Sequence, residues 1–206
     1  MKTYKTLGLI GRFKPLHNGA YALLAAACEQ AEHVVIGIGS VNKYNLRNPF
    51  TPEEVADMIN AVMQPKYTNY NLVFVPDFAQ QPEYADGHRW ASYVVEKFGP
   101  LEAFVSGNPF VQKLLKDNYS IIEPGYLVPR EHWVRLRATE VRIAMAKDED
   151  WQSLVPYSVA TYLEDNGLVT RFQREFGLQT LVLLSSNENF KSDEDARREH
   201  LHAQET

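Results

Sequence analysis

The stretch that most constrains this chain is an apolar run, a glycine-containing turn and an alanine-rich run near its start. Residues 7–10 are apolar and predict a buried strand, and glycine and proline between residues 11 and 19 predict a turn. Residues 20–31 are rich in alanine and favour a helix. A helix that starts after such a turn offers free N–H groups and the positive end of its dipole to an anion. The turn also carries three cationic or N–H-bearing side chains: Arg12, Lys14 and His17.

Short apolar runs alternate with helix-favouring runs along the rest of the chain. We predict strands at residues 33–38, 72–75, 103–105 and 120–123, and helices at residues 52–63, 89–98, 110–116 and 139–146. The second helix has the strongest start signal, with Thr51 as N-cap and Glu54 three residues later, and Thr139 is a further predicted N-cap. This alternation predicts an α/β fold with a doubly wound parallel sheet, whose ligands bind beyond the carboxyl ends of the strands.

Composition excludes several classes of protein. The 206 residues are 45% apolar and carry a net charge of -5, without the basic footprint of a nucleic-acid-binding protein. Cys28 is the single cysteine, so neither a disulfide framework nor a cysteine-based zinc site is possible within this sequence. There is no apolar stretch of membrane-spanning length and no signal-like start, so we expect a cytoplasmic protein without a membrane partner.

The turn reads Gly-Arg-Phe-x-Pro-x-His-x-Gly, which resembles the signature of the HxGH nucleotidyltransferases, and most closely that of the archaeal-type nicotinamide-mononucleotide adenylyltransferases. The resemblance runs through several motifs between residues 7 and 168. It implies a Rossmann-like nucleotidyltransferase domain at residues 1–168, with a helical or disordered extension at 169–206. It also implies transfer of AMP from ATP to nicotinamide mononucleotide (NMN), which forms NAD and pyrophosphate. The implied partners are small-molecule nucleotides and further copies of the chain in a homo-oligomer. Mg²⁺ would bridge phosphates, and we predict no metal site made by the protein.

The resemblance assigns the ATP phosphates to the turn and to two later segments. The turn residues implied are Gly11, Arg12, Phe13, Lys14, His17 and Gly19, of which Arg12, Lys14 and His17 would be catalytic. The alternative for His17 is a purely structural role, as a turn histidine packed on the end of the sheet. Gly39, Ser40 and Arg47 belong to a second motif that leads into Pro-Phe-Thr, where Arg47 would bind phosphate or orient a neighbouring subunit.

A third phosphate motif is Arg137-Ala138-Thr139-Glu140-Val141-Arg142, which is similar to the family's Ser-x-Thr-x-x-Arg. It implies phosphate binding by Arg137, Thr139 and Arg142, with Arg142 also catalytic. Because a guanidinium pairs well with phosphate, we expect Arg142 to contact substrate rather than groups of the core. The alternative is a capped surface helix with solvated arginines.

The resemblance places the nicotinamide ring against Trp90, with Asp77, Gly107 and Asn108 near it. An aromatic plate suits a flat cationic ring, and the amide of Asn108 would hold the carboxamide. The alternative is that Trp90 is a core residue, because it lies at helical spacing from Val94.

Ala20 departs from the family pattern, which has a second histidine there. Both histidines contact phosphate in the family, so the loss of one leaves three possibilities open. The chain is an active enzyme with a rearranged phosphate site, an adenylyl- or cytidylyltransferase for another acceptor such as flavin mononucleotide or phosphopantetheine, or a nucleotide-binding protein without catalysis. Arg137 or Lys14 would supply replacement charge in the first case.

Overall fold

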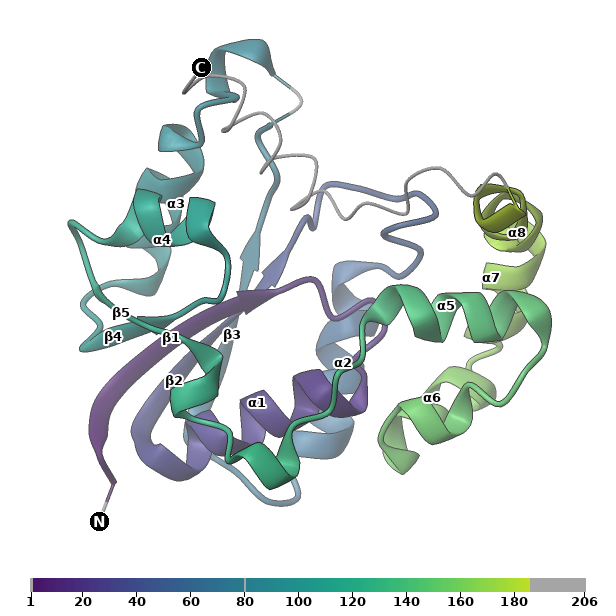
Figure 1. Ribbon diagram of the computed structural model, residues 1–206, viewed down its shortest axis with the longest axis horizontal. Coiled ribbons are helices and arrows are strands. Elements are labelled where there is room, and N and C mark those ends of the chain that lie inside the picture. The colour runs from purple at the N-terminus through teal and green to yellow at the C-terminus, as the bar shows by residue number, and fades with distance from the viewer. Residues whose placement is uncertain (1, 80, 186–206) are drawn as a thin grey trace.

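Five parallel strands form the centre of the computed structural model, which describes residues 2–79 and 81–185 (Figure 1). The strands are β1 (Tyr4–Gly11), β2 (Ala31–Gly39), β3 (Tyr70–Val75), β4 (Ala103–Val105) and β5 (Ser120–Ile122), in the order β3-β2-β1-β4-β5. The order reverses between β1 and β4, where Leu9 pairs with Val105. The predicted doubly wound parallel sheet is therefore confirmed, and its switch point lies at the carboxyl ends of β1 and β4.

Helices cover both faces of the sheet. Helices α1 (Asn18–Gln30) and α2 (Pro52–Met63) pack on one face, around Leu24, Ile36 and Met58. Helices α3 (His88–Phe98) and α4 (Pro109–Leu115) pack on the other, around Val94 and Phe104. Figure 1 shows α3 and α4 together, apart from α1 and α2. Each face thus buries its own apolar cluster, as a sheet of continuous apolar strands requires.

The described part of the chain ends in a group of helices beside the α1/α2 layer (Figure 1). These are α5 (Ala138–Lys147), α6 (Tyr157–Asp165), α7 (Leu168–Phe172), a π-helix (Gln173–Gly177) and α8 (Leu178–Ser185). Short 3₁₀ turns occur at Pro82–Tyr84, Pro124–Tyr126, Arg130–His132 and Gln152–Leu154. Phe172 is buried in the same core as α1 and α2. The division of the chain at residue 168 and the helical or disordered extension at 169–206 remain predictions, and residues 186–206 of that extension lie outside the described residues.

The observed helix N-termini show which of the predicted capping residues are correct. Thr51 caps α2 as predicted, since its Oγ1 accepts from the Glu54 N–H and the Glu54 carboxylate accepts from the Thr51 N–H. Helix α1 begins two residues earlier than predicted, because the His17 side chain acts as its N-cap, and Ala31 belongs to β2 instead of the helix. Thr139 is not an N-cap: α5 begins at Ala138, after Arg137, whose N–H donates to Glu140 at 2.7 Å.

No helix within the described parts of the chain is both long and apolar enough to span a bilayer.

Candidate nucleotide site

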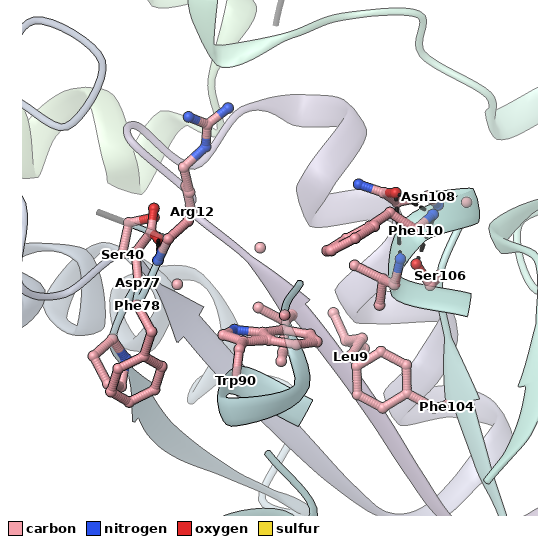
Figure 2. Close-up of a pocket in the computed structure, with 18 of the residues that line it drawn as sticks. Leu9, Arg12, Ser40, Asp77, Phe78, Trp90, Phe104, Ser106, Asn108 and Phe110 are labelled. Carbon is pink, nitrogen blue, oxygen red and sulfur yellow. Dashed lines mark hydrogen bonds between the residues drawn. The ribbon is translucent and has the colours of Figure 1, made fainter. Parts of the chain in front are cut away.

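A cavity of about 450 Å³ lies at the switch point of the sheet, beyond the ends of β1 and β4. Its lining includes eight of the residues named from the sequence: Gly11, Arg12, Gly39, Ser40, Asp77, Trp90, Gly107 and Asn108. In Figure 2, Arg12, Ser40, Asp77 and Phe78 lie on one side, Ser106, Asn108 and Phe110 on the other, and Trp90 between them. Topology therefore brings together side chains from five separate segments.

Aromatic rings form much of the cavity wall. Trp90 comes from α3 and packs on the apolar cluster around Val94 and Phe104, yet its indole also lines the cavity. The two interpretations of Trp90, as a core residue and as a site residue, are therefore compatible. Phe110 comes from α4 and faces the cavity from the opposite side (Figure 2). The sequence analysis did not assign Phe110 to the site, and its position directly after Asn108-Pro109 is the signal that could have shown it. Two such walls suit a flat ring.

Asn108 has a structural task as well as a place in the cavity. Its Oδ1 accepts from the N–H of Phe110 at 2.9 Å and so caps α4, and its own N–H donates to Ser106 Oγ at 3.1 Å. Because the carboxamide oxygen is used in this cap, the Nδ2 group is the part of Asn108 suited to meet a ligand acceptor. The adjacent Gly107 has room for a Cβ, which would lie 3.6 Å from Pro124.

Asp77 is held at the other side of the cavity by the segment that follows β2. Lys43 Nζ lies 2.8 Å from its carboxylate, and Asn42 makes reciprocal hydrogen bonds with the Asp77 backbone at 2.8 and 2.9 Å. The loop after β3 is thereby tied to residues 41–50, which also carry Arg47.

Two glycines of the turn are required by close packing. A Cβ on Gly11 would lie 2.5 Å from the ring of Phe13, which folds back over it with a φ of 51°. A Cβ on Gly19 would lie 2.6 Å from the carbonyl oxygen of Val134, in the segment that precedes α5. Gly19 therefore lets the segment from residue 129 to 137 pass directly over the start of α1.

His17 is the N-cap of α1 and is neutral. Its Nδ1 accepts from the Ala20 N–H at 3.2 Å, so the neutral ring carries its proton on Nε2. Burial is the main cause that lowers the pKa of His17 to about 4. At neutral pH the ring thus presents an N–H donor and no charge, which is suited to hold a phosphate oxygen.

Lys14 does not line the aromatic cavity, and its offer of a cation to phosphate remains a prediction. Its side chain is fully buried, and Nζ donates to the Ser40 carbonyl at 3.0 Å and to Asn48 Oδ1 at 3.4 Å. Burial, followed by the charges of Arg12 and Arg142, lowers the pKa of Lys14 to about 8. Lys14 instead joins the turn after β1 to the ends of the segment that follows β2.

Arg142 is also buried, so the expectation that it avoids groups of the core is wrong, as is the alternative of a solvated arginine. Only 5% of it is exposed; Nη1 donates to the Lys14 carbonyl at 2.8 Å and Nη2 to Thr139 Oγ1 at 3.2 Å. Burial, then the charges of Arg12 and Arg47, lowers the pKa of Arg142 to about 9. Thr139 thus serves to hold this guanidinium.

The positive charges of Arg12 and Arg142 act on Lys14, and those of Arg12 and Arg47 act on Arg142, so four side chains form a cation cluster: Arg12, Lys14, Arg47 and Arg142. Such a cluster repels itself and is relieved by a polyanion, since each charge is attracted by phosphate. Arg12 belongs both to this cluster and to the wall of the aromatic cavity, and Figure 2 shows its guanidinium directed away from Trp90.

Ala20 and Arg137 lie at the starts of α1 and α5. Ala20 is in the first turn of α1 and packs partly on the core, so it offers no side-chain donor at the position where the resemblance implies one. The Arg137 side chain is exposed at the start of α5. Whether Arg137 replaces the missing donor remains a prediction.

Comparison with known sequences gives consistent matches. The profile described as cytidylyltransferase-like matches residues 9–148. A nicotinamide-nucleotide adenylyltransferase of Methanolobus tindarius is 30% identical over 165 residues, covering 80% of this chain and 90% of the relative. One of Thermococcus kodakarensis is 34% identical over 161 residues, covering 76% of this chain and 80% of the relative.

Solved structures share the fold. A bifunctional NMN adenylyltransferase/ADP ribose pyrophosphatase from Francisella tularensis, complexed with AMP and a manganese ion, matches with a TM-score of 0.63 and 18% identity. The match covers 90% of this chain and 57% of that one, so the chain spans little more than half of the bifunctional protein. A second structure of that protein gives a TM-score of 0.66 at 20% identity.

Proposed function

The chain belongs to the cytidylyltransferase-like family, and from this premise we propose that it transfers AMP from ATP to nicotinamide mononucleotide, forming NAD and pyrophosphate. The observation that carries the proposal is the position of Arg12, which lines the aromatic cavity and also belongs to the cation cluster. An acceptor ring in the cavity and a triphosphate at the cluster would therefore meet near one residue.

In the proposed reaction a phosphate oxygen of NMN attacks the α-phosphorus of ATP. The bond from that phosphorus to the oxygen that bridges to the β-phosphate breaks, and pyrophosphate leaves with the bonding electrons. Little covalent work falls to the protein, because positioning and charge stabilisation supply most of the acceleration in phosphoryl-type transfer.

The proposed roles follow from the geometry. His17 donates its Nε2–H to a phosphate oxygen, and the free N–H groups at the start of α1 add further donors. Arg12 and Arg47 contact the phosphates, while buried Lys14 and Arg142 add positive potential and hold the surrounding backbone. The pyridine ring lies between Trp90 and Phe110, with Ser106 and Asn108 available to its carboxamide.

Mg²⁺ belongs to this proposal as part of the ATP complex. Within residues 2–79 and 81–185 no three acidic, histidine or cysteine side chains are grouped to hold a metal. The phosphates themselves would therefore supply most of the ion's ligands, and it would neutralise part of the charge that the arginines face.

A second candidate, a nucleotide-binding protein without catalysis, is favoured by Ala20 alone. Loss of a single donor of this kind costs about 10²–10³-fold in rate in well-studied sites. That loss would lower turnover strongly without abolishing ATP binding, so the two candidates differ in product formation and not in affinity.

Pyrophosphate release tests the proposal. The chain is incubated with ATP, Mg²⁺ and, separately, NMN, nicotinate mononucleotide, flavin mononucleotide or phosphopantetheine, and ATP binding is measured in parallel by calorimetry. We expect pyrophosphate and NAD with NMN. Release with only flavin mononucleotide or phosphopantetheine would assign another acceptor, and ATP binding without release from any mixture would leave the second candidate.

Cytoplasmic location and a closed homo-oligomer remain predictions. Light scattering coupled to size-exclusion chromatography measures the second of these directly.

A further inference from the structure

Residues 41–50 form a loop that carries Arg47 toward the cation cluster. The backbones of Asn45 and Asn48 form two reciprocal hydrogen bonds of 2.7 and 3.2 Å, which close a tight turn within the loop. Asn45 Oδ1 also accepts from the Arg47 N–H at 3.0 Å. Lys14 holds the two ends of the loop through Ser40 and Asn48. These contacts hold the loop from within and from the turn after β1.

Arg171 of α7 also holds the loop, from the C-terminal helices. Its guanidinium donates to both oxygens of Glu54, at 2.5 and 2.7 Å, and Nη2 also donates to the Pro49 carbonyl at 3.1 Å. Glu54 in turn accepts from the Thr51 N–H. Arg171 therefore fastens the point where the loop becomes α2, two residues after Arg47.

Tyr44, which precedes Arg47 in the loop, is a second residue that joins the loop to the C-terminal helices. Its ring lies under the Arg171 guanidinium at 5.9 Å and meets Phe176 edge-on at 5.4 Å, and its hydroxyl donates to Glu175. Glu175 and Phe176 belong to the π-helix Gln173–Gly177. A π-helix turn shifts side-chain directions relative to a regular helix, and here it directs these two side chains at the loop.

The energetics favour positioning over stability as the role of Arg171. Buried or half-buried ion pairs are weak contributors to stability, because desolvation offsets the attraction. Arg171 Nε is buried without a hydrogen-bond partner among the described residues, which adds to that cost. Burial alone would raise the pKa of Glu54, but the hydrogen bonds from Arg171 and Thr51 outweigh it and hold the pKa below its usual value. The pair is thus charged and geometrically specific.

We propose that Arg171 is a positioning residue of the nucleotide site: with Tyr44 it clamps the 41–50 loop to the C-terminal helices and so keeps Arg47 directed at the triphosphate. The proposal rests on the proposed function only in taking ATP as the ligand. It gives the helices after residue 168 a part in substrate binding, although none of their residues lines the cavity.

The test compares Arg171→Met with a matched control, Tyr162→Phe. The Tyr162 hydroxyl donates to Asp57 at 2.9 Å, so it also joins the C-terminal helices to α2, and this hydrogen bond goes to the helix and not to the loop. We expect R171M to weaken ATP binding by about 5–20-fold, which lies within the range of about 2–30-fold for mutations that couple to a site without touching the ligand. Y162F should stay within about twofold, the scatter of additivity for independent sites. The KM for NMN should change by less than about threefold in both variants.

A double variant separates positioning from other effects. If Arg171 acts through Arg47, the ATP dissociation constant of Arg47→Met combined with R171M should lie within about twofold of that of Arg47→Met alone. Multiplication of the two single effects would overturn the proposal. So would equal increases in the KM values for ATP and NMN, which indicate general loosening.

A readout without nucleotide keeps the proposal separate from the proposed function. Trypsin cleaves after Arg47 only when the loop can leave the protein surface, so R171M should be cut at the Arg47–Asn48 bond several times faster than wild type and Y162F. Equal cleavage rates overturn the clamp. If the chain binds ATP but forms no product, the proposed function fails while the ATP affinities and cleavage rates still decide the role of Arg171.

Discussion

Gly19→Ala tests the close approach that brings the segment before α5 over the phosphate-binding turn. The added Cβ would lie 2.6 Å from the Val134 carbonyl oxygen, where ordinary contact begins at 3.4 Å, so the gap must widen by 3.4 − 2.6 = 0.8 Å. The obstacle is backbone and cannot rotate away. Overpacking of this kind costs about 1–3 kcal/mol, and alanine in a helix returns up to about 1 kcal/mol, so we expect a net loss of about 1–2 kcal/mol.

Thermal and urea unfolding measure this loss, which corresponds to a fall in melting temperature of about 2–8 °C for a chain of this size. The Cβ would also lie in contact with His17 Nδ1 at 3.4 Å, so a shift of Gly19 away from Val134 would disturb the cap on α1, and ATP affinity should fall with stability. Gly107→Ala is the control, since Gly107 lines the cavity and its added Cβ would meet nothing closer than 3.6 Å. A Gly19→Ala variant as stable as wild type, or a Gly107→Ala variant destabilised equally, would refute this account of the turn.

Three further predictions concern single side chains of the site. Trp90→Ala should raise the KM for NMN more than that for ATP, by about 1–3 kcal/mol of lost stacking, and steady-state kinetics with each substrate varied will show an equal rise if the indole serves only the core. His17 has its pKa lowered from 6.5 to about 4, so the unfolded chain binds its proton first; its contribution to stability is complete above pH 6.5 and declines by about 2 kcal/mol toward pH 5. His17→Asn keeps a capping acceptor and should remove that part of the pH dependence in urea unfolding, and an unchanged slope between pH 7.5 and 5 would contradict it. Ala20→His adds a donor beside the phosphates and should raise pyrophosphate release by about tenfold, whereas an unaltered turnover number would mean that other groups already supply the contact.

The sequence by itself determined the architecture and the place of the site. Alternating apolar and helix-favouring runs are local signals, and so is the capping box of Thr51 and Glu54, which predicted α2 to the residue. Strand β4 was likewise predicted with the bounds it has. Because parallel strands bring their carboxyl ends to one edge, the order of elements also placed Arg12, Asp77 and Asn108 around one cavity, and the family resemblance added Trp90.

Only the tertiary structure decided what the charged side chains do there. A sequence motif identifies a lysine or an arginine but not its burial, which depends on partners far along the chain. Lys14 bonds a carbonyl 26 residues away, Arg142 bonds the Lys14 carbonyl 128 residues away, and Arg171 pairs with Glu54 across 117 residues. Lys14 and Arg142 therefore brace the backbone around the site, and Arg171, which lies outside every motif, holds the loop that carries Arg47. The sequence could not show these roles, because desolvation and hydrogen bonding depend on packing between distant segments.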